Sequence, residues 1–578
     1  MAVAEAISPI VRPRRARLRL DLPFFAMTLV TAGVGFLVLY PLGMLLFGSF
    51  WTGRPGFPGQ LTFQNYIGAY TNPETYELFV NTVVLMGAKT IIAMALAIVL
   101  AWIVTRTDTP LRATLEILII APFFIPGILE AVGWIMLLSP RAGTVNVFLM
   151  QTFGLAQPPF NIYSLGGMIW VMSLGSTSFM VVLLASALRT MDASLEEAAR
   201  TSGASGIRTA LTVTLPLIAP VILGAGMLSF IRAMETFEVP VLLGLPARIF
   251  VFSSRIYAAV QYDARVNYGL ATALGVSLIV LTLGLILLQN RLLRGKEFFV
   301  VTGKGYRPQV VRLGRFRYVT FAFCLLYFLV ATALPVSQIV ASSFMRVFGI
   351  VQLDMFTLDN YRQIALDAIL WRGLGNTIVV GGAAALLTVL LCSFIAYITT
   401  RTSYPARKAL DVIVWLPWTV PGVVAGLGLL WAYIALPLPF TLYGTLALLV
   451  IAFVTGGLPL GTRLMAGSLV QLGRELEESS RVHGASWGYT FRHVVAPLVK
   501  PAMTAAFVLL FTSFSRSLSS VILLAGLGTE LLSVVLFRYT LNGELSVVAA
   551  LAMVLLTLNV AGLAIARRLG AFGVREIH

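Results

Sequence analysis

Long apolar runs alternate with short polar stretches along most of this 578-residue chain. An α-helix needs about 20 mainly apolar residues to cross the hydrocarbon core of a bilayer, and the runs are close to that length or longer. A membrane span must satisfy its own backbone hydrogen bonds, which favours helices, whereas a β-barrel would give short alternating strands. We therefore expect an all-α polytopic membrane protein.

The apolar runs predict about twelve spans, six in each half of the chain. Those of the first half are approximately 24–50, 78–104, 113–139, 161–188, 216–234 and 268–290. Those of the second half are approximately 318–344, 373–399, 408–435, 442–469, 498–526 and 546–566. Two further segments, 240–262 and 520–536, suit either a full crossing or a re-entrant or interfacial piece, and the pattern leaves both interpretations open.

Composition narrows the class of protein further. Hydrophobic residues make up 58% of the chain and charged residues 11%, whereas soluble domains carry about 25% charged residues. The net charge of +17 comes from residues between the apolar runs, where it orients spans and forms no separate nucleic-acid-binding domain. The two cysteines, Cys324 and Cys392, lie within apolar runs, with no disulfide or metal-ligand spacing. We expect lipid around the chain, no metal site and no nucleic-acid partner.

Lysine and arginine gather in three segments: the amino end, the connection between the halves, and the carboxyl end. Six spans per half place all three on one side of the membrane, and the excess of positive charge marks that side as the cytoplasm. The chain then divides into a basic arm (1–23), a first half (24–290), a basic linker (291–317) and a second half (318–578). Both termini are expected in the cytoplasm.

The two halves repeat each other. Pairs 295 residues apart include Asn65 and Asn360, Arg106 and Arg401, and Pro126 and Pro421; pairs 281 residues apart include Glu197 and Glu478, Gly203 and Gly484, and Pro216 and Pro497. The second half is thus 14 residues shorter between these two blocks. An even number of spans separates the copies, so the halves are parallel repeats that can enclose a path for a solute.

The duplicated block between the fourth and fifth spans of each half lies on the basic side. In the first half, from Leu195 to Pro220, it predicts a short helix that begins with Glu196 and Glu197, then a break at Gly203. A short helix outside the membrane can dock into a groove on another protein. Its carboxylates are also favoured by the helix dipole, so capping is an alternative role.

This block resembles the signature of the permeases of type I ABC importers. The matching residues are Glu197-Ala198-Ala199, Gly203 and Pro216 in the first copy, and Glu478-Ser479-Ser480, Gly484 and Pro497 in the second. Serines replace both alanines in the second copy, which keeps small side chains there. The resemblance runs through both halves and implies a bacterial inner-membrane permease of two six-span repeats.

What the resemblance implies is a transport machine with several subunits. Coupling helices near 195–216 and 476–497 would dock into two copies of a separate ATPase, and a periplasmic or extracellular binding protein would deliver the solute. The docking residues would be Glu197, Ala198, Ala199, Arg200, Gly203, Glu478, Ser479, Ser480, Arg481 and Gly484. The chain lacks a Gly-x-x-x-x-Gly-Lys-Ser/Thr phosphate loop, so it is expected not to be an enzyme, and ATP and magnesium would bind only to the partner.

The fused halves resemble the ferric-iron group of these importers, with aminoethylphosphonate, thiamine and polyamine permeases as alternatives. An ion-gradient-driven transporter is a further alternative, although it would need no docking helices. Charged side chains inside spans tend to face cavities, and the candidates for the path are Glu130, Glu235, Glu238, Arg232 and Arg516. The carboxylates suit ferric iron or a cationic amine; alternatively they pair with Arg232 or Arg255 or reach interfacial water. Arg232 and Arg516, expected at matching places, would suit an anion.

Overall fold

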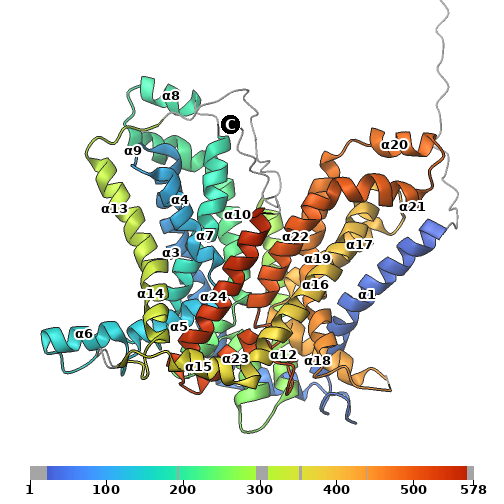
Figure 1. Ribbon diagram of the computed structural model, residues 1–578, viewed down its shortest axis with the longest axis horizontal. Coiled ribbons are helices and arrows are strands. Elements are labelled where there is room, and N and C mark those ends of the chain that lie inside the picture. The colour runs from blue at the N-terminus through green and yellow to red at the C-terminus, as the bar shows by residue number, and fades with distance from the viewer. Residues whose placement is uncertain (1–21, 192–193, 294–309, 350–354, 438, 569–578) are drawn as a thin grey trace, which may run out of the picture.

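The computed structural model describes residues 22–191, 194–293, 310–349, 355–437 and 439–568, and within these ranges the chain is helical with short connections and no extended strands (Figure 1). The predicted all-α fold is therefore confirmed. Most of the basic arm, most of the linker and the last residues of the carboxyl end lie outside the described ranges.

The helices of the first half begin with a long span and end with another. They are α1 (Leu22–Ser49), α2 (Gln64–Thr71), α3 (Pro73–Arg106), α4 (Arg112–Ile120), α5 (Gly127–Leu138), α6 (Thr144–Phe153), α7 (Leu165–Thr190), α8 (Ser194–Thr201), α9 (Gly206–Thr209), α10 (Leu215–Glu235), α11 (Phe252–Tyr257) and α12 (Tyr268–Leu293). Short 3-10 or π pieces, such as η3 (Pro240–Gly244) and η4 (Ala258–Tyr262), join some of them.

The second half follows the same order. Its helices are α13 (Phe316–Phe328), α14 (Leu334–Ser343), α15 (Asp359–Leu366), α16 (Ala368–Arg401), α17 (Arg407–Trp415), α18 (Gly422–Ala435), α19 (Leu446–Gln471), α20 (Glu475–Val482), α21 (Trp487–Thr490), α22 (Ala496–Arg516), α23 (Leu532–Leu541) and α24 (Leu545–Arg568). One helix has no counterpart: α6 lies in the stretch where the first half is longer, and it projects from the side of the molecule (Figure 1).

Two of the expected spans are not continuous helices. The segment predicted as 113–139 consists of α4 and α5, which meet at 97°, and the segment predicted as 408–435 consists of α17 and α18, which meet at 112°. Both breaks lie beside a Pro-Gly pair, Pro126-Gly127 and Pro421-Gly422. Proline has no N–H and disfavours the helical conformation of the residue before it, so the helix ends there.

Each bent pair nevertheless crosses the membrane once. Arg106 at the end of α3 donates from Nη2 to the carbonyl of Leu188 near the end of α7 at 2.8 Å, and Lys89 further back on α3 reaches Ser176 further back on α7. The two helices therefore run in the same direction, and the chain between them must return across the bilayer. Among the described residues, ten helices are long and apolar enough to cross a membrane, and counting each bent pair as one span gives the twelve that the sequence predicts.

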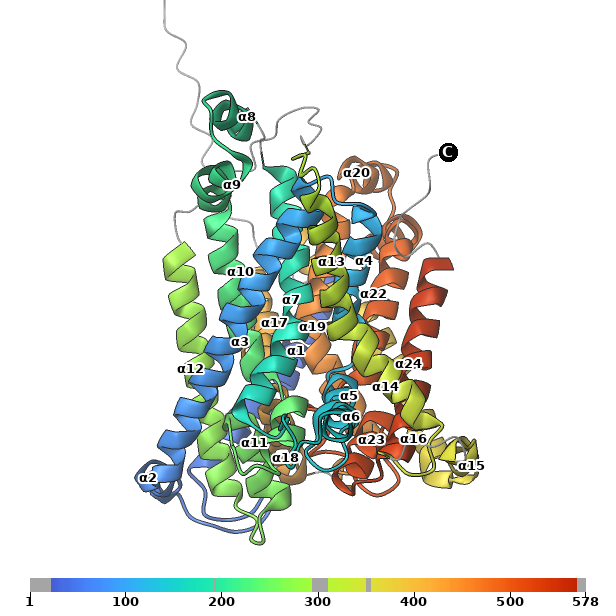
Figure 2. The same ribbon diagram turned by 90° about the vertical axis from the view of Figure 1, so that its left-hand side faces the viewer.

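The two segments that the sequence left open are short pieces. Residues 240–262 form η3, α11 and η4, and 520–536 form turns followed by the start of α23. Both lie at the end of the molecule opposite α8 and α20 (Figures 1 and 2). We call the end that carries α8 and α20 the α8/α20 face.

The first span of each half packs against the other half. Tyr40 of α1 donates its hydroxyl to the carbonyl of Ala432 on α18 at 3.2 Å. On the other side, Tyr327 of α13 donates to the carbonyl of Leu174 on α7 at 2.8 Å. This exchange of first spans, together with one continuous set of buried apolar side chains, joins the halves tightly.

Candidate functional site

A cavity of about 520 Å³ lies between the two halves. Its walls come from α1, α3, α5, α7 and α10 and from α18, α19 and α22. Lys89 and Ser176, near the middle of their long helices, both line it. The cavity therefore lies deep within the membrane-crossing part of the protein, where a path for a solute would have to pass.

The cavity wall carries most of the charged side chains that the sequence singled out. Glu130, Arg232, Glu235 and Glu238 line it, and Arg516 lies just behind, with Nη1 donating to the carbonyl of Phe123 at 3.2 Å. Among the described residues, no two of these charged groups, nor Lys89, approach within the 4.0 Å of an ion pair. Unpaired ionic groups at membrane depth are costly and tend to be functional.

Lys89 is a functional candidate that the sequence analysis missed. Its side chain is only 3% exposed, and Nζ donates to Ser176 Oγ at 2.8 Å, to Ser229 Oγ at 3.0 Å and to the Ser229 carbonyl at 3.2 Å. All three partner atoms are neutral, so they hold the ammonium group in place but do not neutralise its positive charge. A single lysine in the middle of a long apolar run was the signal that could have identified it.

Glu130 and Arg232 face the cavity in different ways. A Cβ at Gly175 would come within 2.7 Å of Glu130 Oε2, so the carboxylate packs directly against the backbone of α7 because glycine leaves that space open. Glu130 Oε1 is buried without a hydrogen-bond partner in the described structure. Arg232 lies over the Phe179 ring, with the guanidinium carbon 5.1 Å from the ring centre, an arrangement that stabilises a cation beside an apolar wall.

Apart from Arg516, these charges belong to the first half. The places that match Lys89, Glu130 and Glu238 in the second half are Ala384, Ala425 and Ser519. The expectation that Arg232 and Arg516 occupy matching places is wrong. Both α10 and α22 have 21 residues, the first ending at Glu235 and the second at Arg516, so Arg516 takes the place of Glu235 and Arg232 that of Ser513.

The suggested pairing of the cavity carboxylates with arginines is also wrong. Arg255 instead binds Asp263 at 2.7 Å and Glu74 at 3.4 Å, at the face opposite α8 and α20. The carboxylates do not converge either, since the described residues contain no group of three acidic, histidine or cysteine side chains placed to hold a metal ion.

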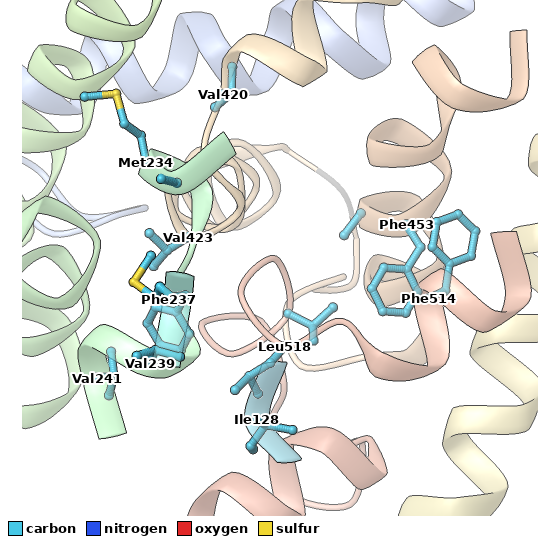
Figure 3. Packing of buried hydrophobic residues seen from close by; sticks show 14 of the residues in the cluster. Ile128, Met234, Phe237, Val239, Val241, Val420, Val423, Phe453, Phe514 and Leu518 are labelled. Atoms are coloured by element: carbon cyan, nitrogen blue, oxygen red, sulfur yellow. The ribbon is translucent and has the colours of Figure 1, made fainter. Parts of the chain in front are cut away.

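A layer of apolar side chains lies beneath the cavity, on the side away from α8 and α20. Phe237 follows directly after the cavity residue Thr236, and its ring lies 5.3 Å from that of Tyr257 and 5.9 Å from that of Phe537. Phe537 comes from the second half. Figure 3 shows Phe237 among other buried apolar side chains. Both phenylalanines are at most 1% exposed. We call Phe237, Tyr257 and Phe537 the aromatic layer.

Two short helices stand at the α8/α20 face, one from each half (Figure 1). Glu197, Ala198, Ala199 and Arg200 lie on α8, and Glu478, Ser479, Ser480 and Arg481 lie on α20. The glycine that follows each helix has positive φ, +89° at Gly203 and +82° at Gly484, and a Cβ there would meet nothing within 4 Å. Glycine is therefore favoured at these turns by backbone conformation and not by lack of space.

Each block has two adjacent glutamates. The first one anchors the short helix, and the second one is the glutamate of the family signature. Glu196 accepts a hydrogen bond from Thr214 at 2.7 Å and lies 3.6 Å from Arg106 Nε. Its counterpart Glu477 accepts from Tyr397 at 2.9 Å and lies 3.6 Å from Arg401 Nε. Within the described residues Glu197 and Glu478 form no ion pair, which leaves their carboxylates available.

Replacing Lys89 with methionine should reduce solute uptake about tenfold or more. A loss of 1.4 kcal/mol in binding or in a barrier is already tenfold, and methionine keeps most of the side-chain volume while removing the charge. Folding should be little affected, because the serine partners are neutral. The measurement is uptake by membrane vesicles, with the exposed Lys500→Met on α22 as matched control. Unchanged uptake in the Lys89 variant would show that the charge takes no part.

Comparison with known proteins gives consistent relatives. The family described as binding-protein-dependent transport system inner membrane component matches residues 93–297 and again 389–571. A putative ferric transport system permease protein of Haemophilus influenzae is 28% identical over 84% of this chain and 75% of its own length. The ferric transport system permease protein of Actinobacillus pleuropneumoniae is 27% identical over 91% of this chain and 75% of its own.

Two further matches each cover less of the chain. A putative 2-aminoethylphosphonate transport system permease protein of Salmonella paratyphi A is 29% identical over 40% of this chain and 86% of its own length. The crystal structure of a bacterial ABC transporter that imports alginate matches 47% of this chain and 96% of that chain, with 23% identity and a TM-score of 0.41. The family match covers more than half of the sequence and occurs once in each half. The chain therefore belongs to the binding-protein-dependent transport system inner membrane components, the permease subunits of type I ABC importers, and contains two such permease units in one polypeptide.

Proposed function

We propose that this chain forms the solute path of an ATP-driven importer, with the α8/α20 face in the cytoplasm and both termini on that side. Two copies of a separate ATPase would bind α8 and α20, and a binding protein would deliver solute at the opposite face. The domain boundaries expected from the sequence, at 24–290 and 318–578, would be the two halves of this path. The observation that carries the proposal is the pair of equivalent helices at one face, connected to a charged cavity between the halves.

In this scheme the available carboxylates of Glu197 and Glu478 contact the ATPase, and the small residues after them permit close packing in its groove. Closure of the ATPase dimer would move α8 and α20 and, with them, the long helices around the cavity. The aromatic layer would close the cavity toward the outside while solute leaves toward the cytoplasm. Opening that layer and closing the cytoplasmic side would complete alternating access.

Ferric iron is the solute that the relatives favour, because two relatives that each match more than four fifths of this chain are ferric transport permeases. Glu130, Glu235 and Glu238 offer hard oxygen atoms that suit this ion. Since they do not converge on one point, iron in this cavity would keep most of its other oxygen ligands. Aminoethylphosphonate is the second candidate, supported by a relative of one half and by the presence of both cationic and anionic groups on the cavity wall.

Reconstitution tests the proposal directly. The chain purified alone should hydrolyse no ATP, because it has no phosphate-binding loop. With its ATPase and binding protein in proteoliposomes it should take up radioactive iron only when ATP and magnesium are present on the ATPase side. Uptake of 2-aminoethylphosphonate in place of iron would support the ATP-driven importer and identify aminoethylphosphonate as its solute. Uptake driven by an ion gradient without the ATPase would contradict the proposal.

A further inference from the structure

A buried ion pair fastens each of the two helices α8 and α20 to a long membrane helix. Arg106 at the end of α3 is 1% exposed and its partner Glu196 on α8 is 14% exposed. Arg401 at the end of α16 is 5% exposed and its partner Glu477 on α20 is 12% exposed. In both pairs the glutamate oxygen lies 3.6 Å from the arginine Nε. We call these two pairs the helix clamps.

The two helix clamps are equivalent contacts, one in each half. Arg106 and Arg401 occupy matching places, as do Glu196 and Glu477. Each arginine also donates from Nη2 to a carbonyl at the end of a second span, Leu188 on α7 and its match Leu469 on α19. The pair is kept in both halves although the charged residues of the cavity wall are not, which points to a role common to both halves.

The supporting hydrogen bonds differ although the ion pairs do not. Glu196 is held by Thr214, at the start of α10, whereas Glu477 is held by Tyr397 on α16. The places that match these two hydroxyl residues are Val495 and Trp102, which have no hydroxyl group. The hydroxyl partner is therefore interchangeable, and the arginine–glutamate contact is the common element.

The two arginines lie where a short helix, a long membrane helix and an exchanged first span meet. The backbone carbonyl of Arg106 accepts a hydrogen bond from Val311 at 2.8 Å, just before the first span of the second half. Thr109 is hydrogen-bonded to Thr320 of that exchanged span at 2.7 Å, and its match Tyr404 is hydrogen-bonded to Thr28 of α1 at 3.1 Å. Each clamp thus connects a short helix with α3 or α16 and, through the next residues, with the exchanged span.

The same long helix continues from the clamp to the cavity. Arg106 and Lys89 are both on α3, and Lys89 lines the cavity. Because an α-helix is a stiff rod over this length, a shift of α8 that pulls on Arg106 also moves Lys89 relative to the other wall. A hydrogen bond at the protein surface could not transmit this displacement. A desolvated ion pair can, because separating its two charges is costly.

We infer that Arg106–Glu196 and Arg401–Glu477 are positioning pairs that transmit the movement of α8 and α20 to α3 and α16, and so set how much solute moves for each ATP consumed. This inference rests on the proposed function. It assigns to the first glutamate of each block an inward, force-bearing role, distinct from the outward docking role proposed for Glu197 and Glu478.

The test compares uptake per ATP hydrolysed by the complete complex in proteoliposomes, with the chain carrying Glu196→Gln, Glu477→Gln or both. Glutamine keeps an acceptor for Thr214 or Tyr397 but removes the charge, so each single variant should lose about fivefold or more in the ratio of uptake to ATP hydrolysis, and the double variant more. ATP hydrolysis itself should continue. The matched control is Glu116→Gln, which breaks the ion pair of Glu116 with the half-exposed Arg189 and should leave the ratio within about twofold.

A lone buried arginine can prevent folding, so a second variant removes both charges. Arg106→Gln with Glu196→Gln leaves no unpaired charge and should assemble with a melting temperature near that of the wild type, while its ratio of uptake to ATP hydrolysis stays low. A normal ratio of uptake to ATP hydrolysis in this neutral variant would overturn the inference. Each charge would then only compensate the other, and the pair would have no part in transmitting movement. Loss of ATP-dependent uptake by the unmodified complex would instead refute the proposed function.

Discussion

Replacing both Gly203 and Gly484 with valine should abolish ATP-dependent uptake while the chain still folds and inserts. Both glycines have a φ that L-residues rarely adopt, and a β-branched residue is the least tolerant of it. The strain, of the order of 1–3 kcal/mol at each site, would be relieved by turning α8 and α20 away from their present direction. The measurements are ATP hydrolysis and solute uptake by the reconstituted complex.

Two controls separate this effect from general damage. Asparagine tolerates positive φ, so Gly203→Asn with Gly484→Asn should keep most of the uptake. Gly154, with φ of +65° and open space around it, ends α6 far from α8 and α20, so Gly154→Val imposes similar strain elsewhere and should leave coupling intact. If the valine double variant transported normally, the turns after α8 and α20 would have no part in coupling.

Removing the rings of Phe237 and Phe537 should make the membrane leak. These rings meet between the halves, 5.9 Å apart and almost fully buried, on the side of the cavity away from α8 and α20. Exchange of both for alanine would leave a gap in the aromatic layer next to the cavity residues Thr236 and Glu238. Solute should then pass without the binding protein and without ATP, and ATP hydrolysis should no longer depend on solute.

The leak is measured as efflux of loaded solute from proteoliposomes that lack ATP. Each Phe→Ala exchange in a packed core costs about 3–5 kcal/mol of stability, so the milder Phe→Leu pair should be tested alongside and should leak less. Trp134→Leu is the matched control, because that ring is equally buried but packs against Trp170 within the first half. Tight vesicles with both rings removed would mean that another layer closes the path.

The sequence predicts the architecture well because membrane spans and repeats leave strong, local signals. Twelve crossings, the all-helical fold and the duplicated block after the fourth span follow from apolar runs and from matched residues. The 97° and 112° bends lie at the Pro-Gly pairs, which the sequence analysis placed inside continuous spans. Proline ends a helix, but the direction of the next one depends on packing against other spans.

The cavity residues show where sequence reasoning stops. Glu130, Glu235, Glu238 and Arg232 could be identified because a charge within an apolar run is costly, and they do line one cavity. Lys89 gave the same signal and was overlooked. The match of Arg516 with Glu235 follows from the 281-residue offset between the duplicated blocks, and the ends of α10 and α22 agree with it.

The separate roles of the two adjacent glutamates could not be predicted from the sequence either. Glu196 and Glu197 have the same chemistry and both stand in the first turn of α8, so the pattern predicts capping or docking for either. Only the position of Arg106, some 90 residues earlier in the chain, shows that one turns inward. Such a contact depends on how α3, α7 and α8 meet in space, which no local pattern records.

The exchange of first spans has a consequence for how the protein is made. While the ribosome is still producing the second half, α1 has no α18 to pack against, and the Tyr40 hydroxyl has no Ala432 carbonyl to bind. Before then, α1 can pack only against helices of its own half, such as α12. A separately produced first half would have to meet its partner by diffusion, whereas in one covalent chain α18 is always within reach of α1.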